Sequence, residues 1–374
     1  MKIWFDILTP KQYLFFEYFI QKLRKQHKIF CTSRKYEQVN GITKFGSINP
    51  VLIGKHGGGD NSSKLLASLE RSKLLTKKIE SQIPDLLISF CSPEASRVAF
   101  GLGIPHIAFS DSPHAKAVMR LSLPYVTKLL TPWIIPKEDF VEFGIAQKNI
   151  IKYKAIDAGV IIKKNGVTDW KRFVRMATDE MEIKNMDVKL SQGLKPFFEN
   201  DHWPYTILIR PEETEAAYIT KKSKTVKIIQ KIVEKFPDDR IVVLSRYKDQ
   251  SNELKKFFGE KILLHTKPVD GYEIFNDASF FVGSGGTMTA ESALLGIPTI
   301  SMNAVPNRIE DFLVKKKLII RSDNPERITK EIVLNVYKKS GRQQEKTRER
   351  AEKILRSFED PYPILLKTIK SVLK

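Results

Sequence analysis

The sequence is poor in cysteine, with only two among its 374 residues, Cys31 and Cys91. Each ends an apolar run, and neither has a histidine at metal-ligand spacing, so we interpret both as reduced, buried small residues and expect no metal site. Long hydrophobic runs are also missing: none approaches the roughly 20 residues that span a bilayer, and no cleavable signal opens the chain. These features predict a cytoplasmic protein without a structural disulfide.

Acidic residues are outnumbered, because 43 Asp and Glu stand against 63 Lys and Arg and leave a formal net charge of +20. Such an excess fits a nucleic-acid partner, an anionic membrane surface, an anionic substrate, or a solvated lysine-rich surface. The chain lacks an arginine-rich tail, an RNP-like aromatic motif and a helix-turn-helix signature, which makes nucleic acid the weaker interpretation. Basic residues beside Phe15, Phe16 and Phe19 suit peripheral contact with an anionic membrane.

Strand and helix patterns alternate along the first half of the chain. The length and the 42% hydrophobic content predict two globular domains of roughly 150–200 residues each. Strand, turn and helix repeated at the observed spacing favour a parallel sheet covered on both faces. The predicted strands are Ile3–Leu8, Lys28–Thr32, Pro50–Ile53, Asp85–Phe90 and Ile104–Phe109, and the predicted helices are about Lys11–Gln26, Ser62–Ser81 and Glu94–Leu102.

The same alternation restarts after a charged stretch that lacks clear strands. The predicted strands of this second series are Tyr205–Ile209, Ile241–Leu244, Ile262–His265, Ser279–Val282 and Pro298–Met302, with helices over Lys221–Phe236 and Met288–Leu295. We therefore predict an α/β protein with two Rossmann-like domains facing each other across a cleft. The domains are residues 1–156 and 204–345, joined by a connector over 157–203 and followed by a helical C-terminal tail over 346–374.

The segment Ser279–Met302 carries the clearest functional signal. Gly283, Ser284, Gly285 and Gly286 connect a predicted buried strand to a helix, with Thr287 in its first turn. A turn without large side chains lets a diphosphate approach the backbone, and the helix N-terminus supplies free N–H groups with a positive partial charge. Glu291 follows one helical turn later, where a carboxylate can accept hydrogen bonds from ribose hydroxyls. The alternative is a tight structural turn followed by a surface glutamate.

Ser284-Gly-Gly-Thr-Met-Thr-Ala-Glu291, followed by Gly296-Ile-Pro298, resembles the donor-binding motif of GT-B glycosyltransferases. The closest pattern is that of the N-acetylglucosaminyltransferase that converts lipid I to lipid II. The resemblance implies a GT-B fold and a nucleoside-diphosphate sugar as the substrate, with no separate cofactor. It also implies that Glu291 holds the ribose and that Ser284–Thr287 meet the diphosphate.

The non-hydrolysing UDP-N-acetylglucosamine 2-epimerases share this fold and a Ser-Gly-Gly turn. Their turn is one residue shorter before the Gly-x-Pro, and it carries paired glutamates early in the helix. Met288–Ala290 contain no such pair, which favours transfer over epimerisation. The whole chain also resembles an uncharacterised, mostly archaeal family that is grouped with these enzymes.

Polar turns after the strands of the first half are the predicted acceptor side, because open α/β sheets bind ligands at the carboxyl ends of their strands. Asp111 and His114 are the best candidates for a catalytic base, since they place a carboxylate and an imidazole in one such turn. This turn follows Gly103-Ile-Pro105, which resembles the same strand in both enzyme groups; a helix cap is the alternative for Asp111. The four candidate turns are Asp6–Gln12, Gly54–Asp60, Ser92–Glu94 and Ser110–His114.

A second acceptor-side element is a glycine-rich loop that could cradle the acceptor or close over the nucleotide. It lacks the Lys-Ser/Thr ending of a phosphate-binding P-loop, which argues against ATP hydrolysis, and an exposed flexible loop is the alternative. Two arginines, Arg210 and Arg246, end strands of the second half, and either could neutralise the diphosphate. The loop residues are His56, Gly57, Gly58, Gly59 and Asp60.

The sequence therefore favours a metal-independent glycosyltransferase of GT-B type that transfers a sugar from a nucleoside-diphosphate sugar. No Asp-x-Asp metal motif stands in a strand-end turn, and the acceptor is unknown, with a lipid-linked or glycan acceptor in keeping with the resemblance. One alternative is an epimerase or hydrolase acting on the same donor. Another is a non-catalytic basic binding protein that uses the cleft only as a scaffold.

Overall fold

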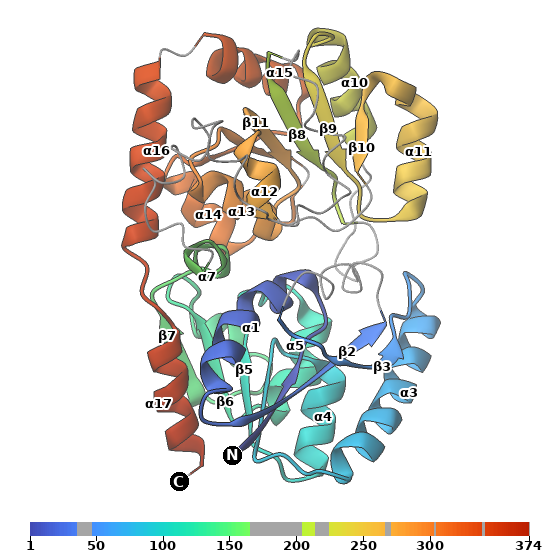
Figure 1. The fold of residues 1–374 in the computed structure, drawn as a ribbon, viewed down its shortest axis with the longest axis vertical. Coiled ribbons are helices and arrows are strands. Elements are labelled where there is room, and N and C mark those ends of the chain that lie inside the picture. The colour runs from blue at the N-terminus through green and yellow to red at the C-terminus, as the bar shows by residue number, and fades with distance from the viewer. Residues whose placement is uncertain are drawn as a thin grey trace, which may run out of the picture.

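The structure is a computed structural model, which describes residues 1–35, 47–164, 204–213, 224–265, 271–302, 304–338 and 341–373. These residues form two fully parallel sheets with helices packed around them, one above the other along the long axis of Figure 1. The predicted α/β class with two Rossmann-like domains is confirmed. Most of the predicted connector, residues 165–203, lies outside the described residues.

The first sheet has seven strands in the order β3-β2-β1-β4-β5-β6-β7. The strands β2 and β3 lie on one side of β1, and the later strands β4 to β7 lie on the other side. The strands are β1 (Lys2–Asp6), β2 (Lys28–Lys35), β3 (Val51–Lys55), β4 (Leu86–Ser89), β5 (His106–Phe109), β6 (Lys128–Pro132) and β7 (Ile150–Tyr153). The helices are α1 (Pro10–Leu23), α3 (Asn61–Glu80), α4 (Pro93–Gly101), α5 (Lys116–Ser122), α6 (Glu138–Val141) and α7 (Asp157–Lys164). The predictions did not include β6 and β7.

The second sheet has six strands in the order β10-β9-β8-β11-β12-β13. The strands are β8 (Thr206–Arg210), β9 (Arg240–Leu244), β10 (Leu263–His265), β11 (Phe280–Gly283), β12 (Thr299–Ser301) and β13 (Ile319–Arg321). The helices are α10 (Thr225–Lys235), α11 (Lys248–Phe258), α12 (Gly271–Asn276), α13 (Gly286–Leu294), α14 (Arg308–Lys315), α15 (Pro325–Ile332), α16 (Gly341–Arg356) and α17 (Tyr362–Val372). The predictions did not include β13, a short edge strand that follows three lysines.

Both faces of the first sheet are buried, which explains why its strands read as continuous apolar runs. In β1, Ile3 and Phe5 belong to one hydrophobic cluster, whereas Trp4 between them belongs to another. The α1 side chains Phe15, Phe16 and Phe19 are fully buried in the first cluster and contact Phe109 of β5 in edge-to-face or tilted geometry. The aromatic side chains on which the expected membrane contact rested are therefore core residues, and the contact itself stays a prediction.

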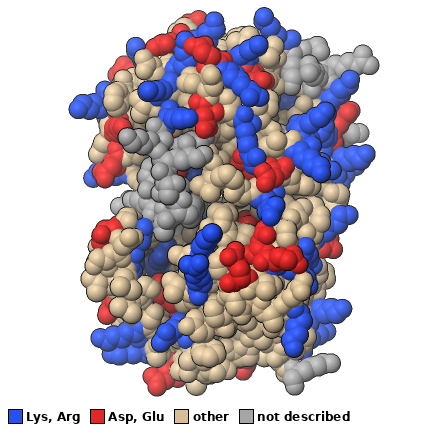
Figure 2. Space-filling model, turned by 180° about the vertical axis from the view of Figure 1, so that it is seen from behind, with Lys and Arg blue, Asp and Glu red and all other residues tan. Residues whose placement is uncertain are grey.

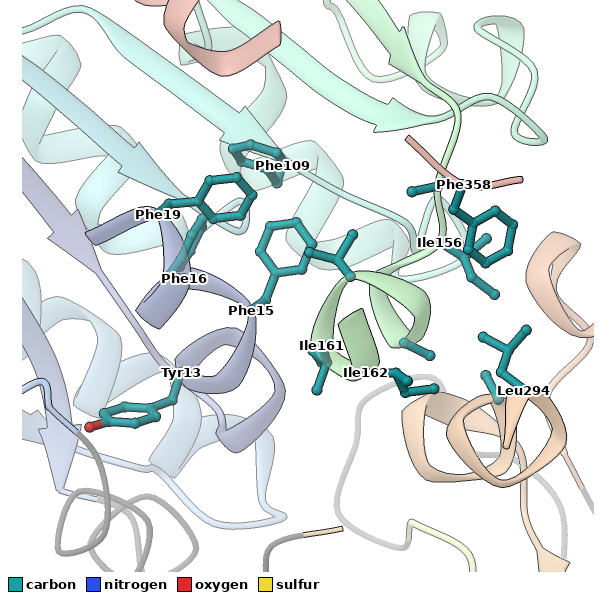
Figure 3. Packing of buried hydrophobic residues seen from close by; sticks show 14 of the residues in the cluster. Tyr13, Phe15, Phe16, Phe19, Phe109, Ile156, Ile161, Ile162, Leu294 and Phe358 are labelled. Atoms are coloured by element: carbon teal, nitrogen blue, oxygen red, sulfur yellow. The ribbon is translucent and has the colours of Figure 1, made fainter. Parts of the chain in front are cut away.

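Helix α7 lies between the two domains (Figure 1) and packs against both α1 and α13. Its apolar residues Ile161 and Ile162 are buried between α1 and Leu294 of α13 (Figure 3). A single helix therefore carries the packing from the first sheet to the helix that contains the Ser284–Glu291 motif.

The C-terminal segment returns to the first domain. Helix α16 packs against α13, whereas α17 packs against β6. At the crossing, Lys154 N donates a hydrogen bond to Glu359, and the ring of Phe358 contacts Trp133 after β6 with centroids 5.7 Å apart. The chain therefore connects the two domains a second time, beside the segment that leads into α7.

A matched pair of glycine substitutions tests the packing at this crossing. A Cβ added to Gly159 of α7 would lie 2.4 Å from the Phe358 ring, whereas one added to Gly101 of α4 would have no described atom within 4 Å. We expect Gly159→Ala to lower the free energy of unfolding by about 1–3 kcal/mol through overpacking, despite the higher helix propensity of alanine. Gly101→Ala should leave stability unchanged or raise it. Thermal and urea unfolding of both variants measure this, and equal midpoints would contradict the tight packing.

Candidate functional site

The turn between β11 and α13 presents an uncapped helix N-terminus at the carboxyl end of the second sheet. Gly285 (φ 80°) and Gly286 (φ 77°) have a backbone conformation that favours glycine, and no described side chain caps α13. Gly283 also needs to be glycine, because an added Cβ would lie 2.4 Å from Thr289 Oγ1 and from the Phe281 ring. The first N–H groups of α13 are therefore not used by a capping side chain, as an anion site requires.

Three of the predicted nucleotide-sugar residues converge at the end of β8. The carbonyl of Pro211 accepts hydrogen bonds from Ser284 Oγ and from Arg246 Nε, both at 3.1 Å. Arg210 Nη1 donates to the carbonyls of Leu244 and Ser245 at the end of β9, at 2.9 and 3.0 Å. The two arginines thus tie neighbouring strand ends together and place positive charge beside the turn that begins α13.

The remaining residues of the predicted motif lie on α13 itself. Thr287 is half-buried in the first turn, and Thr289 Oγ1 donates to the carbonyl of Gly285 at 3.0 Å. Glu291 is only 6% exposed. This residue is therefore buried rather than on an open surface.

In the first domain, Asp111 lies in a cluster of three charged side chains that sequence analysis did not foresee. Lys11 Nζ, at the start of α1, is 2.5 Å from Asp111 Oδ2 and 2.7 Å from Asp157 Oδ2, at the start of α7. Tyr153 donates a hydrogen bond to Asp157 Oδ1 at 3.0 Å, and Ser112 donates to Asp111 Oδ1 at 2.7 Å. No local motif could have shown this, because the three segments meet only in the folded chain.

One ammonium group cannot neutralise two buried carboxylates, so the cluster favours a proton on one of them. Burial and the charge of Asp111 raise the pKa of Asp157 to about 7. Burial would also raise the pKa of Asp111, but the charge of Lys11 outweighs it and holds this pKa low. Burial lowers the pKa of Lys11, but the two neighbouring carboxylates outweigh this effect and raise it. Below about pH 7 the pair therefore holds one proton, which favours Asp157 and leaves Asp111 ionised.

His114 and the glycine-rich loop complete the predicted first-domain residues. Burial lowers the pKa of His114, which lies within electrostatic reach of Asp111 and Lys11. Burial also lowers the pKa of His56 to about 4, assisted by Arg34 and Lys64 and opposed by Glu213 of the second domain. Both imidazoles are therefore neutral near pH 7, so each could accept a proton.

The glycine-rich loop lies within electrostatic range of the second domain, because the charge of Glu213, which follows β8, acts on His56, which follows β3. Within the loop, Gly57 must be glycine, since an added Cβ would lie 2.6 Å from the Lys64 backbone, whereas Gly59 has no described atom within 4 Å of that position. Gly58 N donates to His56 Nδ1 at 3.1 Å. Asp60 caps α3 by accepting from Ser63 N at 2.7 Å, which gives it a structural task.

Asp6, a further candidate in the first turn, is committed to a buried ion pair. Its Oδ1 is 2.7 Å from Arg71 Nη2 and accepts from Thr32 Oγ1 at 2.5 Å. Arg71 is itself 1% exposed and is also paired with Glu94, in the first turn of α4. This network holds β1, β2, α3 and α4 together.

No group of three or more His, Cys, Asp or Glu in the described ranges could hold a metal ion. Among the helices there, none is long and apolar enough to span a membrane. On the face seen in Figure 2, basic side chains are spread over both domains and interspersed with acidic ones. The positive charge is thus not confined to one stripe of this face.

The family model described as "Protein of unknown function (DUF354)" matches residues 1–374. The chain belongs to this family. The chain is similar in sequence to the uncharacterized protein MJ0665 of Methanocaldococcus jannaschii. It is 27% identical over 346 residues, which cover 91% of this chain and 93% of the relative.

Solved structures show the same two-domain fold. A UDP-GlcNAc 2-epimerase from Neisseria meningitidis, bound to UDP-GlcNAc, superposes with a TM-score of 0.71 at 14% identity, covering 99% of this chain and 100% of that one. A glycosyltransferase from Rickettsia africae superposes with a TM-score of 0.60 at 12% identity, covering 100% and 98% of the two chains. The predicted similarity in fold to GT-B glycosyltransferases and to 2-epimerases is therefore confirmed.

The proton shared by Asp111 and Asp157 predicts a pH dependence of stability. The raised pKa of Asp157 means that the folded state binds this proton more tightly than the unfolded state does, so the stabilisation is lost as the pH rises toward about 7. We expect Asp157→Asn to remove this part of the decline between about pH 4 and pH 7. Urea unfolding at several pH values measures it, with Asp249→Asn on α11 as the control. An unchanged slope in Asp157→Asn would contradict the shared proton.

Proposed function

We propose that the protein is an enzyme that acts on a nucleoside-diphosphate sugar, and that it is a glycosyltransferase. The diphosphate would lie at the N-terminus of α13, beside Ser284, Arg246 and Arg210. The base would come from the first domain, where Asp111 lies. This arrangement needs no divalent cation, because the helix N-terminus and the arginines supply the positive charge that the departing diphosphate requires.

The observation that carries the proposal is that α7 contacts both the helix that begins at the Ser284 turn and the charged cluster of the first domain. The uncapped N-terminus of α13 favours an anion, and α13 packs against α7. The Lys11–Asp111–Asp157 cluster anchors the start of the same helix from the first domain. Glycosyl transfer needs an electrophilic sugar, which a diphosphate bound at α13 would carry, and a proton acceptor, which Asp111 would supply.

The residues take separate tasks in this reaction. The N–H groups of α13 would stabilise charge on the diphosphate as the bond between the sugar and its phosphate breaks. Asp111, kept ionised by Lys11, would accept the proton of the acceptor hydroxyl, with neutral His114 as the neighbouring alternative. Glu291 would accept hydrogen bonds from the ribose diol. The acceptor we propose is a hydroxyl of a glycan or of a lipid-linked sugar.

Epimerisation of the same substrate is a second candidate, and the carboxyl pair favours it. When a carbon that bears hydrogen is inverted by proton transfer, one proton is removed from one face and another is returned to the opposite face. Asp111 and Asp157 together hold one ionised and one protonated carboxyl, which provides both an acceptor and a donor. A transferase needs only the acceptor, so the two reactions differ in their need for Asp157.

Binding of UDP tests the nucleotide half of the proposal. We expect Glu291→Gln to weaken UDP affinity by about 10- to 100-fold, because charge-assisted hydrogen bonds of roughly 1.5–3 kcal/mol to the ribose are lost. Glutamine is the chosen replacement because Glu291 is buried. Calorimetry in the presence of a chelator, with Glu253→Gln on α11 as control, measures the effect and the metal independence together.

A 2′-deoxy nucleotide completes this test. It should bind the native protein less tightly than UDP does. Its affinity should be nearly the same for the native protein and for Glu291→Gln, so the two proteins and the two nucleotides form a double-mutant cycle. If Glu291→Gln binds UDP as the native protein does, the ribose role is wrong. If the chelator abolishes binding by the native protein, the metal-independent mechanism is wrong.

Turnover of UDP-GlcNAc separates the two candidate reactions. We expect Asp111→Asn to lower the turnover number by about 100-fold or more, the usual scale for a general base. For a transferase, release of UDP should require an acceptor, and Asp157→Asn should have a smaller effect than Asp111→Asn. For an epimerase, the sugar nucleotide should be converted without an acceptor, and both variants should fail. Normal turnover by both Asp111→Asn and His114→Ala would place the base elsewhere.

A further inference from the structure

Glu310, in the first turn of α14, holds a buried carboxylate beside the turn that begins α13. Its side chain is 4% exposed, and its Oε1 accepts a hydrogen bond from Arg321 Nε at 2.5 Å. Oε2 has no hydrogen-bond partner among the residues that the structure describes. An ideal Cβ on Gly285 would lie 3.0 Å from this Oε2. The carboxylate therefore stands against the backbone of the residue that precedes α13.

An unpaired carboxylate oxygen in the interior is costly, so its position calls for a physical reason. The positive end of α13 stabilises a nearby negative charge, and Arg321 neutralises part of it. Neither effect supplies Oε2 with a hydrogen-bond donor. Oε2 is an acceptor without a donor, and it lies beside helix N–H groups that no described side chain caps. A ligand that satisfies both must bring an anionic group and a hydrogen-bond donor.

We propose that Glu310 Oε2 accepts a hydrogen bond from a hydroxyl or amide N–H group of the donor sugar, next to the diphosphate at α13. The inference rests on the proposed function and extends it from the nucleotide to the sugar. A sugar diphosphate offers phosphate oxygens to the helix and a hydroxyl or N–H group to the carboxylate. The terminal phosphate of a free nucleoside diphosphate, which takes the place of the sugar-linked phosphate, offers only anionic oxygens at this position, and Glu310 repels them.

This arrangement makes Glu310 a residue for specificity and for product release. While the sugar is attached, the hydrogen bond to Oε2 favours the substrate. Once the sugar has left, the diphosphate faces a carboxylate that has lost its donor, which weakens the binding of the product. The same side chain therefore favours the substrate over the product at one site.

Calorimetry with UDP-GlcNAc and UDP tests the proposal. In Glu310→Gln, Arg321 requires the amide oxygen as its acceptor, so the amide NH₂ group takes the place of Oε2 and turns an acceptor into a donor. We expect the ratio of UDP-GlcNAc affinity to UDP affinity to fall by about ten-fold or more, the scale of one hydrogen bond to a charged group. UDP affinity itself should stay equal or rise.

Asp311→Asn is the matched control, because Asp311 is the other partner of Arg321, at 2.7 Å, and its side chain is 51% exposed. It should leave the affinity ratio at the native value. An unchanged ratio in Glu310→Gln overturns the proposal, and so does an equal loss of affinity for both ligands, which would indicate structural damage. Native protein that binds neither ligand contradicts the proposed function and this inference with it, whereas the other outcomes contradict this inference alone.

Discussion

The ammonium group of Lys11 joins three segments that are far apart in the sequence: the start of α1, the turn after β5 and the start of α7. The turn follows a strand of the first sheet, and α1 and α7 are helices that pack against each other. The two ion pairs therefore fix the positions of both helices relative to the sheet. Because α7 in turn packs against α13, the placement of the second domain's candidate anion site depends on this interaction. Removing the cation would leave buried carboxylates without compensation, which is more damaging than removing one carboxylate.

Much of the fold could be predicted from the sequence, because both sheets are parallel and covered on both faces. Strands such as β1 and β11 then appear as short apolar runs between turns, and α3 matches its predicted range within one residue at each end. The strands β6, β7 and β13 were missed for a physical reason. β6 and β7 contain lysines and β13 follows three of them, which obscures the apolar run, and β7 and β13 are edge strands, where less apolar sequence is needed.

The candidate site was predictable where its residues are contiguous. The turn from Gly283 to Thr287 could be predicted because a strand, a glycine turn and a helix are adjacent in the chain. The partners of Asp111 could not, since Lys11 precedes it by 100 residues and only the tertiary fold brings them together. Glu310 gave no signal either, because a glutamate in the first turn of a helix is ordinarily a favourable surface residue. Its burial against Gly285 is a property of the packing between α13 and α14.

The return of the chain to the first domain has a mechanical consequence. The segment that leads into α7 and the segment between α16 and α17 cross the domain boundary side by side, joined by the hydrogen bond from Lys154 to Glu359 and by the contact of Gly159 with Phe358. Two tethers at one place act as a hinge with a defined axis, whereas a single tether would act as a swivel. Any relative rotation of the domains must turn about this edge. The opposite edge of the first sheet, at β3 (Figure 1), would then travel furthest.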